Sequence, residues 1–161
     1  MKALISTTLV ASCLGLVAHA AGGGKLATIP DFTRGDTIPE KAKKDWNLGP
    51  TGARGWMYCD RLVTTDARQI VLTAVDKGSP ADGVLAVGDV LLGVGGKDFS
   101  FDPRTEFGRA ITDAETEKGG GKLALTRWRA GKTEQVVVKL PVMGSFSATA
   151  PYDCPKSTRI L

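Results

Sequence analysis

The fold of this chain is decided by residues 75–96, which read VDKGSPADGVLAVGDVLLGVGG. A Ser-Pro pair at residues 79–80 favours the start of a short helix, because serine caps free N–H groups and proline at the first helical position loses no hydrogen bond. Gly83 can then end that helix in a left-handed conformation. The apolar run at residues 90–94 has the length of a buried strand, and the glycines at 95–96 suit a hairpin turn. The stretch therefore predicts a short helix, a strand and a tight turn in succession.

Regular elements are also predicted on both sides of this stretch. Residues 68–75 alternate as a half-buried strand does, and residues 122–129 and 134–140 are two further strands joined as a hairpin. Between them, residues 103–118 carry apolar side chains at the spacing of an amphipathic helix. These side chains belong to Phe107, Ala110, Ile111 and Ala114. The length of 161 residues suggests one domain plus tails.

A glycine-rich loop runs into a short apolar strand at residues 45–58. Its glycines and proline argue against a helix, whereas Trp56, Met57 and Tyr58 favour a strand. Glycine also permits the backbone angles with which successive N–H groups point into one concavity, and such a nest holds a carboxylate. Arg54 would add positive charge beside it. Two interpretations stay open: a plain connection that places Trp56 in the core, or the carboxylate-binding loop that the family resemblance described next implies at this position.

Residues 78–96 resemble the middle of a PDZ domain of the bacterial type, in which a Gly-Ser-Pro-Ala turn and a Gly-Asp-Val-Leu strand occur in this order. The resemblance extends over residues 45–141. It implies a PDZ-like α+β fold: a partly open antiparallel β-barrel or sandwich of five to six strands with one short and one long helix. It further implies a non-catalytic module of an exported protein. Such a module captures an extended peptide, in particular the C-terminus of a partner protein, by strand addition.

The same resemblance implies where the peptide would bind. One wall of the groove is the glycine-rich loop with the strand that follows it, and the other wall is the helix that begins at Pro103. The loop would hold the terminal carboxylate, and apolar pockets would select side chains. The expected site consists of Gly52, Ala53, Arg54, Gly55, Trp56, Met57, Tyr58, Phe107 and Ile111.

The flanks at residues 47–56 and 147–155 also look like the N-terminal part of an uncharacterised family of large exported bacterial proteins. In that family a PDZ-like module is followed by a long helical domain. The alternative function is therefore structural: the module would pack against a C-terminal domain of a larger protein or enzyme. Residues 142–161, which have no periodicity, are then a tail or a linker.

The N-terminus has the features of a secretory signal peptide over residues 1–20. Lys2 precedes an apolar run too short to span a bilayer comfortably, and a small-x-small cleavage site ends at Ala20. The expected mature chain is periplasmic or extracellular, without a membrane span and with a flexible tether at residues 21–44. A lipidated Cys13 is the alternative, although apolar residues continue beyond it where a polar tether would be expected.

Composition excludes several classes of function. The only histidine, His19, lies in the segment to be removed, so a Ser-His-Asp or Cys-His catalytic arrangement and a histidine metal site are excluded. A net charge of +4 is too small and too dispersed to argue for nucleic acid. No cofactor is expected. An oxidising compartment permits a disulfide between Cys59 and Cys154, and two unpaired cysteines are the alternative.

Overall fold

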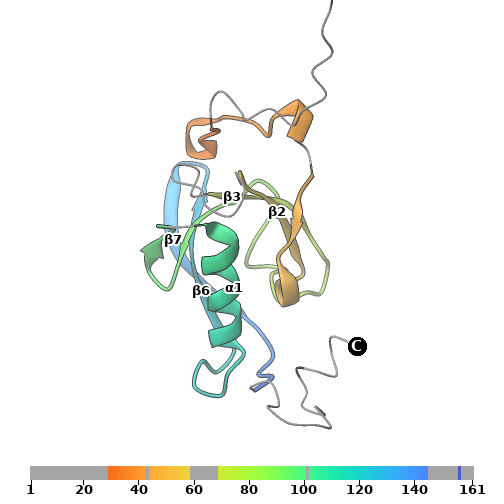
Figure 1. Cartoon of the computed structure of the whole chain (residues 1–161), viewed down its shortest axis with the longest axis vertical. Coiled ribbons are helices and arrows are strands. Elements are labelled where there is room, and N and C mark those ends of the chain that lie inside the picture. Colours follow the sequence, from red (N-terminus) through yellow and green to blue (C-terminus); the bar gives the residue numbers. More distant parts are fainter. Residues whose placement is uncertain (1–28, 43, 59–68, 101, 145–155, 157–161) are drawn as a thin grey trace, which may run out of the picture.

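A computed structural model describes residues 29–42, 44–58, 69–100, 102–144 and 156 of the chain. Its framework is a seven-stranded antiparallel sheet with the order β1-β2-β3-β4-β6-β7, and β5 pairs with β4 beside this path (Figure 1). The strands are β1 (Trp46–Asn47), β2 (Ala53–Trp56), β3 (Ile70–Val75), β4 (Val90–Val94), β5 (Lys97–Asp98), β6 (Lys122–Arg129) and β7 (Lys132–Lys139). Because β1 and β7 stand at its two ends, the sheet is not closed into a barrel.

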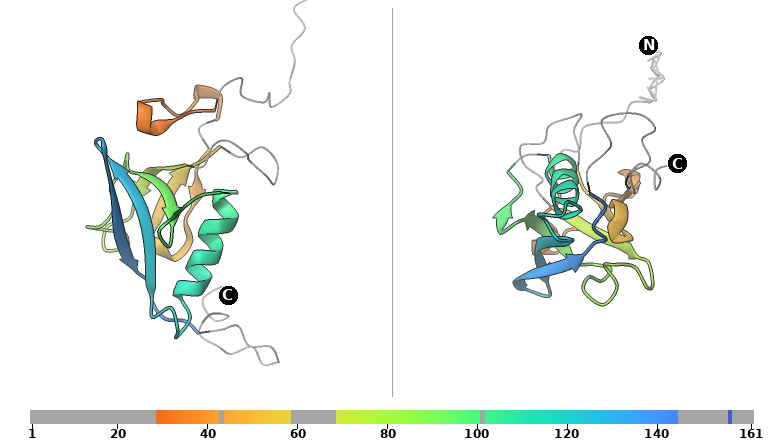
Figure 2. Two further views of the ribbon diagram at one scale, coloured as in Figure 1. Left: turned by 90° about the vertical axis from the view of Figure 1, so that its left-hand side faces the viewer. Right: turned by 90° about the horizontal axis from the view of Figure 1, so that it is seen from below.

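Helix α1 (Pro103–Ala114) packs along this sheet (Figures 1 and 2). It begins as the sequence predicts, because Asp102 is its N-cap and accepts a hydrogen bond from the N–H of Arg104 at 2.9 Å. It ends at Ala114, four residues before the predicted end. In the described part of the chain, three short 3-10 helices precede β2: η1 (Phe32–Arg34), η2 (Glu40–Ala42) and η3 (Gly49–Thr51).

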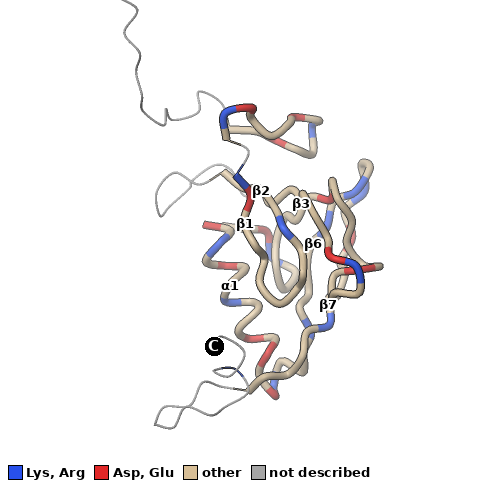
Figure 3. The backbone as a smooth tube through the Cα atoms, turned by 90° about the vertical axis from the view of Figure 1, so that its right-hand side faces the viewer, with Lys and Arg blue, Asp and Glu red and all other residues tan. Residues whose placement is uncertain are grey.

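The main core lies between α1 and the sheet. Phe107 and Ala114 are the buried apolar residues that α1 contributes after its first position. The sheet and its loops contribute buried aliphatic, aromatic and sulfur-bearing side chains, which include Leu48, Met57, Ile70, Leu72, Leu85, Leu91, Phe99, Leu123, Leu125, Val138 and Leu140. At β1, the end of the sheet comes close to α1, and β1 lies between β2 and α1 (Figure 3).

The α+β class predicted from the sequence is confirmed, and the sheet has seven strands instead of five to six. The predicted short helix at residues 79–83 is wrong, because this segment consists of consecutive turns. Gly83 is left-handed, with a φ of 77°, so only residues 80–82 follow Ser79, too few for successive helical hydrogen bonds. The N–H of Ala81 donates to the carbonyl oxygen of Thr51 at 3.0 Å. The hydroxyl of Ser79 is buried without a partner and so does not cap a helix.

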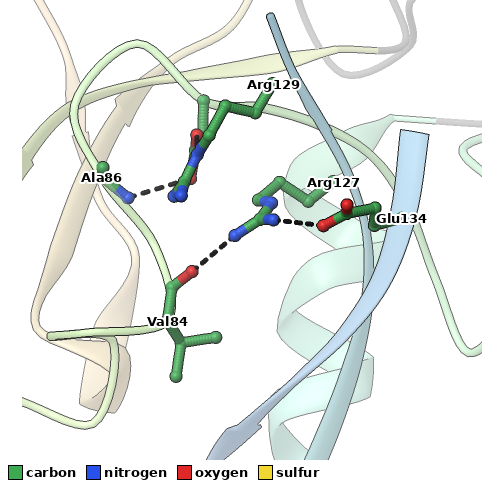
Figure 4. A network of polar contacts seen from close by, with 6 residues as sticks. Val84, Ala86, Arg127, Arg129 and Glu134 are labelled. Atoms are coloured by element: carbon green, nitrogen blue, oxygen red, sulfur yellow. Dashed lines mark hydrogen bonds and ion pairs between the residues drawn. The ribbon is translucent and has the colours of Figure 1, made fainter. Parts of the chain in front are cut away.

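A network of charged side chains fixes the turn that follows this segment (Figure 4). The carboxylate of Asp89 is 1% exposed and accepts hydrogen bonds from Arg129 at 2.5 and 2.7 Å and from the N–H of Ala86 at 2.9 Å. Arg127 donates to the carbonyl oxygen of Val84 at 2.8 Å. Two side chains of β6 therefore hold the turn before β4 in place.

Residues 29–42, which fall in the segment expected to be a tether, pack onto the body of the domain. Phe32 is 6% exposed and meets Trp56 edge to face, with ring centroids 5.6 Å apart. The indole N–H of Trp56 donates to the carbonyl oxygen of Ala42. Phe32 and Trp56 form a second apolar cluster with Tyr58 and Val90. This segment is therefore continuous with the folded domain.

Several predictions concern residues outside the described part of the chain. These are the signal peptide at residues 1–20, the lipidated Cys13, and the pairing of Cys59 with Cys154. Among the residues that are described, no helix combines the length and the hydropathy needed to cross a bilayer. The same residues hold no group of three or more histidine, cysteine, aspartate or glutamate side chains suited to a metal ion.

Candidate functional site: the groove between β2 and α1

The groove expected between β2 and α1 contains a segment of the chain itself. Strand β1 pairs with the edge of β2 that faces away from β3, with Trp46 opposite Gly55 and Asn47 opposite Arg54. Over this part of β2, both edges are therefore taken up by neighbouring strands. β1 runs antiparallel to β2, and it lies where we expected the peptide of a partner to bind.

Asp45, the residue before β1, holds this segment to the sheet. Its carboxylate accepts hydrogen bonds from Nε of Arg54 at 3.1 and 3.2 Å, from Nη2 of Arg54 at 2.5 Å and from the hydroxyl of Thr73 at 2.6 Å. These bonds, with that from Arg54 the strongest, lower the pKa of Asp45 from 3.8 to about 2. One carboxylate thus connects the N-terminal segment to both β2 and β3.

Trp46 holds the same segment to α1. Its ring lies under the guanidinium of Arg104, with the central carbon 5.4 Å from the ring centroid. Arg104 is in turn fixed by the carboxylate of Asp102, at 3.0 Å from Nε and 2.5 Å from Nη2. Burial alone would raise the pKa of Asp102, but its hydrogen bonds with Arg104 keep it below the ordinary value. The cation that covers Trp46 is therefore anchored to a buried group.

The loop predicted to bind a carboxylate has its N–H groups paired within the chain. Gly49 donates to the side-chain oxygen of Asn47 at 2.8 Å, Gly52 donates to the carbonyl oxygen of Gly49 at 3.2 Å, and Ala53 donates to the hydroxyl of Thr51 at 3.1 Å. Gly49 and Gly52 have φ values of 66° and 70°, in the left-handed region that favours glycine. The oxygen that accepts the N–H of Gly49 belongs to Asn47 of β1, so this hydrogen bond also comes from the segment in the groove.

Six of the nine predicted site residues are buried, and their side chains divide between two clusters. Trp56 and Tyr58 pack with Phe32 in the second apolar cluster, so they do not line the groove. Ala53, Met57 and Phe107 belong to the main core. Buried side chains are those of Ala53, Trp56, Met57, Tyr58 and Phe107. Arg54 is exposed, and Ile111 is half-buried with its Cδ1 3.5 Å from the position of a Cβ on Gly49. Gly55 is buried, and a Cβ added there would stand 2.6 Å from Cγ2 of Ile70, so a larger residue does not fit at this position.

Four residues that sequence reasoning did not single out have direct roles in the groove: Asp45, Trp46, Thr73 and Arg104. Their sequence signal is weak, because each is an ordinary polar or aromatic residue without a motif. The nearest signal was the opposite charge of Asp45 and Arg54 on either side of a glycine-rich turn, which is the pattern of a hairpin with a cross-strand ion pair.

A cavity of about 610 Å³ opens on the other flank of α1. Its walls are α1, the β4–β5 turn and the first residues of β6, and they include Val94, Lys97, Glu106, Ala110 and Leu123. None of the nine predicted site residues borders it. The two flanks of α1 therefore differ: one faces this open cavity, and the other faces the groove that β1 fills.

Comparison with protein-family models, with curated proteins and with solved structures gave no match. The function of this chain is therefore inferred from its own residues and their geometry.

Proposed function

We propose that this chain is a PDZ-like, non-catalytic binding module of an exported protein, and that it captures an extended peptide by strand addition beside β2. The observation that carries the proposal is the occupant of the groove. β1 is an extended segment that pairs antiparallel with Arg54 and Gly55, next to α1. A space that accepts a strand of the chain itself has the width and the backbone partners that a strand of another protein requires.

The bond between Asn47 and Gly49 suggests how the end of such a peptide is held. The side-chain oxygen of Asn47 accepts the N–H of Gly49 at 2.8 Å. When β1 leaves the groove, Asn47 leaves with it, and the N–H of Gly49 becomes available to a terminal carboxylate. Arg54, at the same turn, would contribute positive charge.

Titration with a library of C-terminal peptides tests this function. Peptides with a free C-terminus are expected to bind more tightly than the same peptides with an amidated C-terminus, because amidation removes the negative charge. Equal binding of both forms would exclude recognition of the terminal carboxylate, but it would remain compatible with strand addition. Absence of binding by every peptide, at concentrations up to about 1 mM, would refute the proposed function.

The absence of catalysis follows from the same proposal. After cleavage near Ala20 the chain has no histidine, and the serine, lysine and cysteine side chains lack a base partner singled out by the sequence. The mature chain is therefore expected to hydrolyse no peptide. Release of a fluorophore from a quenched peptide library, at a rate proportional to the amount of protein, would contradict this.

A second candidate function is structural, as a module that packs against a further domain of a larger protein. The contact that favours it is an ion pair at the end of α1, where Lys156 lies 2.9 Å from the carboxylate of Glu115. Both side chains are nearly buried, at 11% and 8% exposed. The N–H groups of Met143 and Gly144 also donate to the carbonyl oxygen of Glu115. The C-terminal segment is therefore attached to the body of the domain at this point.

The two candidate functions predict opposite results for peptide binding. A structural module would bind no peptide of the library, either as the wild type or as a Lys156→Ala variant. A binding module would keep its peptide affinity in that variant, since Lys156 lies at the far end of α1 from Arg104.

A further inference from the structure

We infer that the groove recognises an extended segment in which an acidic residue is followed directly by an aromatic residue, and that Asp45 and Trp46 occupy these two positions in the free chain. The inference rests on the proposed function and adds the chemical class of the ligand. The ligand is a segment of a partner protein that takes the place of the chain's own segment, residues 45–47.

The position for the acidic residue is built from two neighbouring strands. Arg54 of β2 donates from Nε and Nη2, and Thr73 of β3 donates from its hydroxyl at 2.6 Å. Three donors that converge on one carboxylate select an acid over its amide, because an amide nitrogen can accept no hydrogen bond from them. The side chains of Arg54 and Asp45 are 44% and 24% exposed, so this position is reached from solvent.

The position for the aromatic residue is prepared by α1. Arg104 is fixed against the buried carboxylate of Asp102, and its guanidinium lies over the ring of Trp46. Because Asp102 also caps the helix, the cation keeps its place whether or not an aromatic ring lies beneath it. A cation above a flat surface site favours Trp, Tyr or Phe at the position after the acid.

The segment that now fills these positions is short and lies at the surface. β1 has two residues, both exposed, and Trp46 is 41% exposed. The next residue, Leu48, is 4% exposed and belongs to the main core, so it marks the point at which displacement stops. Removal of residues 45–47 therefore breaks one short ladder, the ion pair with Arg54, one ring contact and the hydrogen bonds from Thr73 and Gly49, without opening the core.

Fluorescence polarisation with labelled peptides tests the inference on the full mature chain. The probe has the sequence of residues 44–49, KDWNLG, and its two variants carry Asn in place of Asp or Ala in place of Trp. The receptors are the wild type, the double variant Asp45→Ala/Trp46→Ala, the variant Arg54→Ala and the control Asp113→Ala. Asp113 borders the cavity on the other flank of α1, so its removal changes the charge of the helix without touching the groove.

The double variant is expected to bind the probe about tenfold more tightly than the wild type does, because its positions are no longer occupied. The Asp-to-Asn probe should bind about fivefold less tightly to it, which is the loss typical of one exposed charge-assisted contact. Arg54→Ala should bind both probes equally, and Asp113→Ala should match the wild type. Should the double variant unfold, Trp46→Ala alone gives the same comparison, because that side chain is exposed.

Each of the other possible results of this experiment would refute a specific part of the inference. If the double variant Asp45→Ala/Trp46→Ala binds the probe no better than the wild type does, residues 45–47 do not occupy the ligand positions. If it binds extended peptides without preference for Asp-Trp, strand addition stands and the ligand class falls. If neither receptor binds any peptide, the proposed function falls too. If the variant takes up labelled wild-type chain as tightly as the probe, the occupant is a second copy of this chain and not a partner protein.

Discussion

The contact between Gly52 of the glycine-rich loop and Ser79 of the turn segment at residues 79–83 gives the sharpest test of this fold. A Cβ on Gly52 would stand 2.2 Å from Cβ of Ser79 and 2.7 Å from its Oγ, and the φ of Gly52 is +70°. A Gly52→Ala substitution therefore meets two penalties. The left-handed conformation costs an L-residue about 1–2 kcal/mol, and the overlap with Ser79 costs about 1–3 kcal/mol because backbone or turn must move by more than an ångström.

Gly78 is the matched control, because its φ is +76° and nothing lies within 4 Å of the position of its Cβ. Gly78→Ala carries only the conformational penalty. The Gly52→Ala variant should therefore be about 2 kcal/mol less stable than the Gly78→Ala variant. Urea unfolding followed by tryptophan fluorescence measures both, provided that the m-values agree. Ser79→Gly in the Gly52→Ala chain should recover most of the excess, with the Ser79→Gly chain as reference.

The reasoning would be refuted if the two alanine variants differed by less than about 0.5 kcal/mol, the scatter expected of independent sites. Loop and turn would then not be in contact, and the groove would lack the support beneath its glycine-rich end. An excess that Ser79→Gly failed to reduce would place the overlap elsewhere.

Three further changes probe other parts of the structure. Arg54 lowers the pKa of Asp45 from 3.8 to about 2, so this pair adds stability above pH 3.8 and loses it as the pH falls towards 2. In urea unfolding, the Asp45→Asn variant should be about 1 kcal/mol less stable than the wild type at pH 5 and equally stable at pH 2. Arg129→Ala leaves the buried carboxylate of Asp89 without its main partner and should cost about 3 kcal/mol, part of which Asp89→Asn in the same chain restores, as thermal unfolding would show. Phe32→Ala should cost about 3 kcal/mol in the same assay, and an unchanged melting temperature would mean that residues 29–42 do not support the fold.

Much of the fold follows from patterns within short stretches of sequence. The apolar run of β4 and the alternation in β6 gave both strands with their observed bounds, and Asp102-Pro103 gave the start of α1. The predicted short helix failed because the left-handed Gly83 leaves only three residues after Ser79, too few for successive helical hydrogen bonds. What the pattern could not show is the bond from the N–H of Ala81 to the carbonyl oxygen of Thr51, thirty residues away in sequence.

The site was less predictable than the fold, for a related reason. The glycine-rich loop and α1 were placed on the two walls of one groove, but the sequence did not show that β1 lies between them. Two residues have no periodicity, so β1 is defined only by its pairing with Gly55 and Arg54. The contacts of Asp45 with Thr73 and of Trp46 with Arg104 join segments that only the folded chain brings together.

The exposed ring beneath Arg104 also has a spectroscopic consequence. Trp46 is 41% exposed and lies against a cation, whereas Trp56 is 4% exposed and lies against Phe32. Departure of residues 45–47 from the groove would move Trp46 from the guanidinium into water and leave the surroundings of Trp56 unchanged. The tryptophan fluorescence of the unlabelled protein would then change with occupancy of the groove. A ligand that carries Phe in place of Trp contributes no tryptophan fluorescence, so the change would come from the protein alone.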